Sequence, residues 1–100
     1  MNIEEIGKIR GSIMENIKLI RGKKVSNLDK CIARDCIVEA VGSLERKYIY
    51  RMALSSKDLV AREIYKVLRE VETELFLYLE YVNNNDFEIS EVYRKLTLFL

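Results

Sequence analysis

Apolar residues recur along the chain in steps of three and four, the spacing that lines one face of an α-helix. Four segments carry this pattern, at about residues 3–21, 28–54, 57–82 and 89–99. The chain has no proline and only four glycines, fewer turn-forming residues than a β-rich chain of 100 residues would need. The sequence therefore predicts an all-α fold, a small antiparallel bundle of three long helices plus a short C-terminal helix, in one domain over residues 1–100.

Each predicted helix has an apolar stripe, and the four stripes together form the predicted core. The first stripe is Ile3, Ile6, Ile9, Ile13, Ile17 and Ile20. The second is Leu28, Ile32, Cys36, Ala40, Val41, Leu44, Tyr48 and Met52. The third is Val60, Ile64, Val67, Leu68, Val71, Leu75, Leu79 and Val82. The fourth is Ile89, Val92, Tyr93, Leu96, Phe99 and Leu100.

Local signals mark where the helices begin and end. Ser26 with Asp29, and Ser55 with Asp58, are partial capping patterns for the second and third helices. Gly22 is predicted to follow the last residue of the first helix, and residues 83–86 (Asn-Asn-Asn-Asp) to form a turn.

The glycines within the predicted helices bear on helix packing and helix stability. Gly7 and Gly11, four residues apart, either let another helix approach closely or weaken the first turns of their own helix. Gly42 marks a close crossing or a bend in the second helix.

The end of the third predicted helix is apolar nearly all round, from Leu75 to Val82, which is typical of a helix buried on more than one side. The chain also ends on Leu-Thr-Leu-Phe-Leu, so this end is predicted to dock on its own bundle or on another chain. A single small bundle would leave some of this apolar surface exposed to solvent. We therefore expect a homo-oligomer or a protein partner. The predicted interface anchors are Phe76, Tyr78, Tyr81, Phe99 and Leu100.

Charge is balanced overall, at a formal +1, but unevenly placed. Residues 1–24 hold six bases and three acids, whereas residues 70–91 hold seven acids and no base. Two interpretations stay open. Complementary patches could drive self-association, or antiparallel helices could neutralise each other within one chain.

Two basic clusters support an alternative function, nucleic-acid binding through basic helix faces. The first is Lys18, Arg21, Lys23 and Lys24, and the second is Arg62, Lys66 and Arg69. Tyr65 lies next to the second cluster and could stack on a base. A third, mixed basic and aromatic stretch covers residues 45–51.

The composition argues against an enzyme. Without histidine there can be no Ser-His-Asp or Cys-His catalytic system, and no Glu-x-x-His di-iron site. Glu70 and Glu74 share a helix face but are expected to be solvated, and Cys31 and Cys36, five residues apart, point to different helix faces. We expect no catalytic residues, no metal and no cofactor.

The chain is expected to be cytoplasmic and to have no contact with a membrane. Its first residues carry acids where a secretory signal carries bases, and no window approaches 18 apolar residues. The abundance of Lys, Glu, Ile and Tyr is compatible with a thermophile or an AT-rich genome.

Residues 28–74 resemble the helical domain of archaeal GINS subunits, the scaffold proteins of the replicative helicase assembly. That family pattern is a long helix ending in a basic run before small apolar residues, then a short turn and a helix with acidic and aromatic residues. The residues that carry the resemblance are Arg46, Lys47, Met52, Ala53, Leu54, Glu63, Ile64 and Tyr65. The resemblance implies a non-catalytic scaffold subunit of an oligomeric DNA-replication complex.

Overall fold

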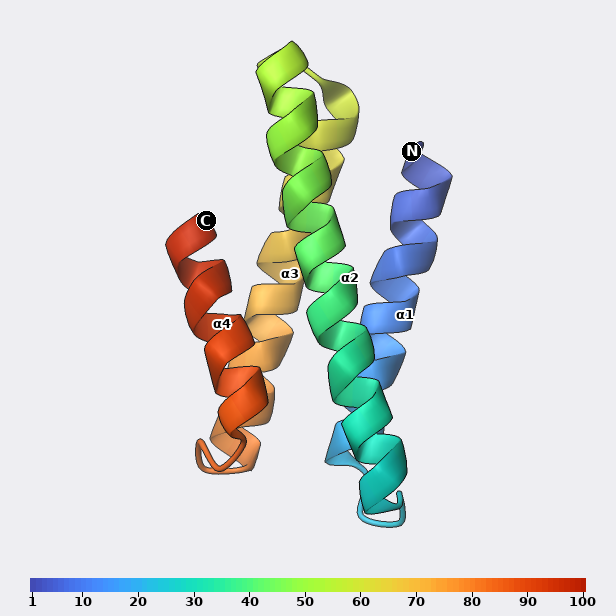
Figure 1. The fold of residues 1–100 in the computed structure, drawn as a ribbon, viewed down its shortest axis with the longest axis vertical. Helices are drawn as coiled ribbons and strands as arrows, with labels where there is room; N and C mark the ends of the chain where they lie inside the picture. The colour runs from blue at the N-terminus through green and yellow to red at the C-terminus, as the bar shows by residue number, and fades with distance from the viewer.

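The computed structural model describes all 100 residues and contains four helices and no strand. They are α1 (Ile3–Arg21), α2 (Asn27–Leu54), α3 (Leu59–Tyr81) and α4 (Phe87–Phe99) (Figure 1). The prediction of an all-α bundle with three long helices and one short helix is confirmed. The helix ends differ from the predicted ones by two residues at most.

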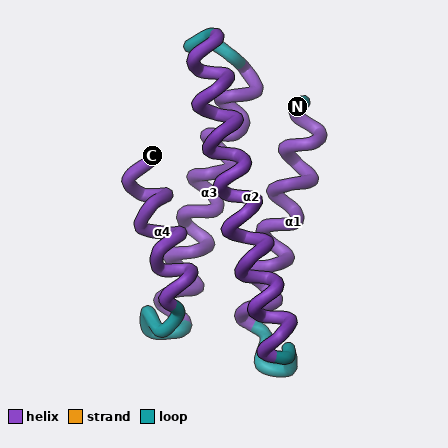
Figure 2. The backbone as a smooth tube through the Cα atoms, viewed as in Figure 1, coloured by secondary structure: helices purple, strands orange, loops and turns teal.

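Consecutive helices run antiparallel and are joined by short loops at the ends of the bundle (Figure 2). Helices α1, α2 and α3 all pack on one another, and α4 packs on α2 and α3. Helices α1 and α4 make no contact, because they flank the α2–α3 pair on opposite sides (Figure 1). The bundle is therefore flat and long, with extents of 43 × 25 × 16 Å and a radius of gyration of 13.8 Å, against about 12.7 Å for a compact domain of this length.

A side-chain oxygen caps the N-terminus of every helix. Asn2, Ser26, Asp58 and Asp86 each accept a hydrogen bond from the backbone N–H three residues later. The predicted cap at Ser26 is confirmed. At α3 the cap is Asp58 and not Ser55, because Ser55 donates its N–H to Arg51 at the end of α2.

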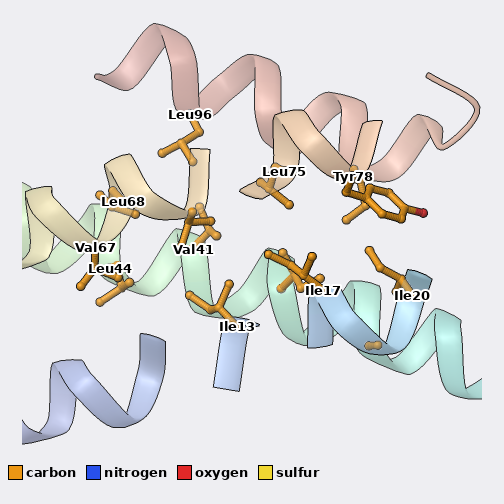
Figure 3. Packing of buried hydrophobic residues seen from close by; sticks show 14 of the residues in the cluster. Ile13, Ile17, Ile20, Val41, Leu44, Val67, Leu68, Leu75, Tyr78 and Leu96 are labelled. Carbon is orange, nitrogen blue, oxygen red and sulfur yellow. The ribbon is translucent and has the colours of Figure 1, made fainter. Parts of the chain in front are cut away.

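The core is one continuous cluster of buried side chains from all four helices (Figure 3). The stripes predicted for the first, third and fourth helices line this core, although Ile3 itself is 57% exposed. The predicted stripe of the second helix is wrong in its first half. Ala33 and Ile37 are buried there, whereas Leu28, Ile32 and Cys36 are exposed. The lines 28, 32, 36 and 33, 37, 41 have the same four-residue spacing and lie about 100° apart around the helix, so spacing alone could not choose between them.

Gly22 directly follows α1, as predicted. Its φ is an ordinary −67°, and a larger residue would lack space, since a Cβ there would lie 2.6 Å from Cγ2 of Val25. Gly7 and Gly11 have open space beside them, so neither marks a helix crossing within the chain. At Gly42 the nearest side chain is that of Arg46, from the same helix. The turn predicted at residues 83–86 is confirmed, and Asn83 and Asn84 adopt positive φ there.

Candidate interaction surfaces

The five predicted interface residues fall into three groups in the structure. Tyr78 is only 2% exposed and packs inside its own bundle, so it is not available to a second chain. Phe99 and Leu100 are half-buried against the core, and the ring of Phe99 packs edge-on against Tyr48 at 5.6 Å. The C-terminal end is therefore docked on its own bundle, one of the two outcomes that the sequence left open.

Phe76 and Tyr81 remain about half exposed on α3. The ring of Phe76 lies 6.2 Å from that of Tyr93 on α4, and the guanidinium of Arg21 stands 4.9 Å above the ring of Tyr81. Such a cation–π contact adds about 0.5–1 kcal/mol at an exposed site. Both aromatic rings thus already have partners on one side within the chain.

A buried carboxylate fastens α4 to α2 and α3. Asp86 accepts hydrogen bonds from Nε of Arg34 at 2.8 Å, from the hydroxyl of Tyr78 at 2.5 Å and from the N–H of Ile89 at 3.1 Å. Burial alone would raise the pKa of Asp86, but these three hydrogen bonds outweigh it and hold the pKa below its ordinary value. Burial and the Asp86 carboxylate raise the pKa of Tyr78 to about 12.

The sequence did not reveal this cluster of Arg34, Tyr78 and Asp86. Asp86 follows three asparagines and precedes a helix, which marks it as a cap. Its partners lie 52 and 8 residues away in the chain, so only the packing of three helices brings them together.

A groove of about 610 Å³ runs between α2 and α4. Its floor is apolar, with Val38 and Val41 from α2 and Val92 from α4, and the side chain of Arg46 lies close to Gly42. Phe87 stands at the start of α4 with 83% of its side chain exposed. The remaining lining residues are Glu39, Glu45, Arg46, Glu88, Glu91 and Lys95.

The rim of this α2/α4 groove carries four carboxylates and two cations. Burial raises the pKa of Glu45, although Arg46 and Lys95 act in the opposite direction. Burial and then the neighbouring carboxyl of Asp35 raise the pKa of Glu88. Carboxylates therefore outnumber cations on this rim, and burial is the main reason that the pKa values of Glu45 and Glu88 are raised.

A surface rich in basic and exposed apolar residues lies at the turn between α2 and α3. Residues 47–62, which we call the hairpin tip, include the α2–α3 turn, which projects beyond the ends of α1 and α4 (Figure 1). Ile49, Tyr50, Leu54 and Leu59 are each more than half exposed there. A bidentate pair between Arg51 and Asp58, at 2.8 and 3.0 Å, holds the turn. The tip holds four bases and one acid.

Each basic cluster predicted for nucleic acid is exposed, but the two lie toward opposite ends of the long axis (Figure 1). Arg62, Lys66 and Arg69 form one stripe on α3, where Lys66 pairs with Glu63 at 3.6 Å and Arg69 with Glu72 at 3.9 Å. The other cluster, Lys18, Arg21, Lys23 and Lys24, lies at the end of α1 and the loop after it. The clusters cannot act as one continuous surface.

Some of the acids in residues 70–91 are neutralised within the chain. Glu70 pairs with Arg10 of α1 at 2.6 Å, and Asp86 pairs with Arg34. No group of three or more Cys, Asp or Glu side chains is arranged to hold a metal ion, and both cysteines are free and exposed. No helix has the length and apolar character that a membrane crossing requires.

No protein-family model, curated protein or solved structure shows significant similarity to this chain. The resemblance to the helical domain of GINS subunits stays a prediction, and function is inferred from the chain's own surfaces.

Proposed function

We propose that this chain is a non-catalytic helical interaction module that associates with further copies of itself or serves as a subunit of a larger complex. The observation that carries the proposal is its large exposed apolar surface. The accessible surface is 6516 Å², against about 5,900 Å² for a compact monomer of this mass. Fourteen large apolar side chains are at least 38% exposed.

The placement of these side chains matters more than their number, because scattered apolar residues are normal on a protein surface. Four of them gather at the hairpin tip, and Val38 and Phe87 belong to the α2/α4 groove. Burying a large apolar side chain that is two-thirds exposed contributes about 1–2 kcal/mol. A partner that covered the tip would thus gain several such contributions from one small area, which is typical of an interaction surface.

A scaffold role within a larger assembly is one form of this function. The resemblance of residues 28–74 to GINS subunits favours such a role in DNA replication. The hairpin tip lies within that stretch, so the part of the chain that carries the resemblance also carries the four exposed apolar side chains of the tip.

Light scattering over a concentration series tests self-association directly. We expect a mass above the monomer value of 11.8 kDa that rises with concentration. Loss of the larger species in high salt would assign the contact to charged groups, and its persistence would assign the contact to apolar groups. A constant mass of 11.8 kDa up to millimolar concentration would refute self-association, and a pull-down from source lysate would then test the subunit role.

Nucleic-acid binding is the second candidate function, favoured by the exposed stripe of Arg62, Lys66 and Arg69. It predicts that affinity for labelled DNA or RNA falls steeply with salt. Reversing the charge of Arg62 and Arg69 should weaken that binding and reduce its salt dependence. No binding at low salt would exclude this function.

A further inference from the structure

We propose that two copies of this chain form a closed antiparallel dimer in which the hairpin tip of each copy enters the α2/α4 groove of the other. This inference rests on the proposed function, because it names the surface and the partner of the self-association.

The groove has the chemistry of a site for a cationic, apolar segment. Its floor is apolar, and the one side chain close to Gly42 is the end of Arg46, whose Nη1 would lie 3.2 Å from a Cβ there. Along its rim, α2 contributes Glu39, Glu45 and Arg46, and α4 contributes Glu88, Glu91 and Lys95.

Glu88 lines the end of the groove nearest the α3–α4 turn, and burial and then the carboxyl of Asp35 raise its pKa. Arg34 is the nearest cation, but its Nε is bonded to Asp86 at 2.8 Å. A cation from a second molecule would relieve the repulsion between these two carboxyl groups.

The hairpin tip supplies what the groove lacks. It contains four bases and only one acid, and that acid, Asp58, is already paired with Arg51. Lys57 is exposed at the turn itself. The tip also carries the apolar side chains Ile49, Leu54 and Leu59, each more than half exposed.

The tip and the groove lie on the same face of α2, which allows both copies to use both surfaces at once. Ile49 follows Gly42 by seven residues and Val38 by eleven, which are two and three helical turns. A two-fold axis that crosses α2 between Glu45 and Arg46 therefore sets Ile49 of each copy opposite Gly42 of the other.

The same axis also pairs the charges. Glu45 of one copy comes opposite Arg46 of the other, and the turn carrying Lys57 comes level with Asp35 and Glu88. One symmetry operation thus gives a partner to the exposed Ile49 and to the acidic end of the groove. Because the contact is reciprocal, it closes as a dimer and does not propagate into a fibre.

Charge reversal with rescue tests this arrangement. In the proposed dimer, residue 57 of each copy lies near residue 88 of the other. In a dimer of Lys57→Glu alone, or of Glu88→Lys alone, both of these contacts join like charges. We expect each variant alone to dimerise about ten- to a hundredfold more weakly than the wild type. An equimolar mixture should recover the dimer, because both contacts of the mixed pair are again between opposite charges.

Two further variants complete the test, each followed by light scattering with circular dichroism to confirm folding. Gly42→Leu should give a folded monomer, because its side chain would occupy the place of Ile49. Lys23→Glu, the same charge change at the other end of the bundle, should leave the dimer intact.

The outcomes separate this inference from the proposed function. A dimer that persists in Lys57→Glu, Glu88→Lys and Gly42→Leu alike would overturn the inference and leave self-association standing. Failure of the mixture to recover the dimer would also overturn it. A wild-type chain that is monomeric at every concentration would overturn both.

Discussion

Replacing Tyr78 with phenylalanine isolates one hydrogen bond in the cluster that fastens α4. The ring is 2% exposed and stays in the core, while the hydroxyl that donates to Asp86 is lost. Asp86 keeps its bonds from Arg34 and from the Ile89 amide, so no buried charge is left without a partner. A hydrogen bond to a charged group contributes about 1.5–3 kcal/mol, and we expect the variant to lose about 2 kcal/mol of unfolding free energy. For a domain of this size that lowers Tm by about 8–15 °C.

The dependence on pH tests the burial of the same hydroxyl, to which its bond with Asp86 adds. The pKa of Tyr78 is raised, chiefly by burial, to about 12 from an ordinary 10, and a shift of two units corresponds to about 3 kcal/mol. A group whose pKa is higher in the folded state stabilises fully below its unfolded pKa. Its contribution is then lost as pH rises through the folded value. The wild type should therefore lose stability between pH 10 and 12, and Tyr78→Phe should lose less.

Urea unfolding at pH 7 and between pH 9 and 12, followed by circular dichroism, measures both effects. The chain has six tyrosines and no tryptophan, so ultraviolet absorbance reports tyrosine ionisation directly, and the last step of that titration should be missing in Tyr78→Phe. Tyr65→Phe is the matched control, because Tyr65 is half-buried against Tyr48 and should lose little stability. A change below about 0.5 kcal/mol in Tyr78→Phe would show that the bond does not hold α4.

Two further predictions concern a cap and a pair of glycines. The pKa of Asp86 is held below its ordinary value, so its stabilisation is present above about pH 4 and lost as pH falls through the folded pKa. Asp86→Asn should thus lose about 2–3 kcal/mol at pH 7 and show a weaker acid dependence in urea unfolding. Gly22→Ala should lose about 1 kcal/mol because its Cβ would meet Val25, whereas Gly7→Ala should gain about 0.5–1 kcal/mol because nothing lies nearby. Equal effects at the two glycines would contradict the steric argument.

Residue spacing was enough to predict the helices, most of their core residues and the turn before α4. A stripe in steps of three and four stays on one face, and it identified Ile13 and Ile17 of α1 and Leu68 and Leu75 of α3. The cap at Ser26 and the asparagine turn are local chemistry within a few residues, whereas the cap of α3 was expected at Ser55 and lies at Asp58. Such features depend on neighbouring residues alone, so they are readable before any packing is known.

In α2 the spacing failed, because apolar residues lie all round this helix and several stripes compete. Contacts with α1, α3 and α4 decided that Ala33 and Ile37 are buried and that Leu28 and Ile32 are not. The same packing put Tyr78 inside the core and left Ile49 and Leu54 on a projecting tip.

The sequence by itself determined where the helices begin and end, because these depend on short-range backbone and side-chain chemistry. The tertiary structure alone decided which faces those helices hide, where the α2/α4 groove opens and which polar groups meet across it. Arg34, Tyr78 and Asp86 come from three different helices, and their contact requires the whole bundle to be packed.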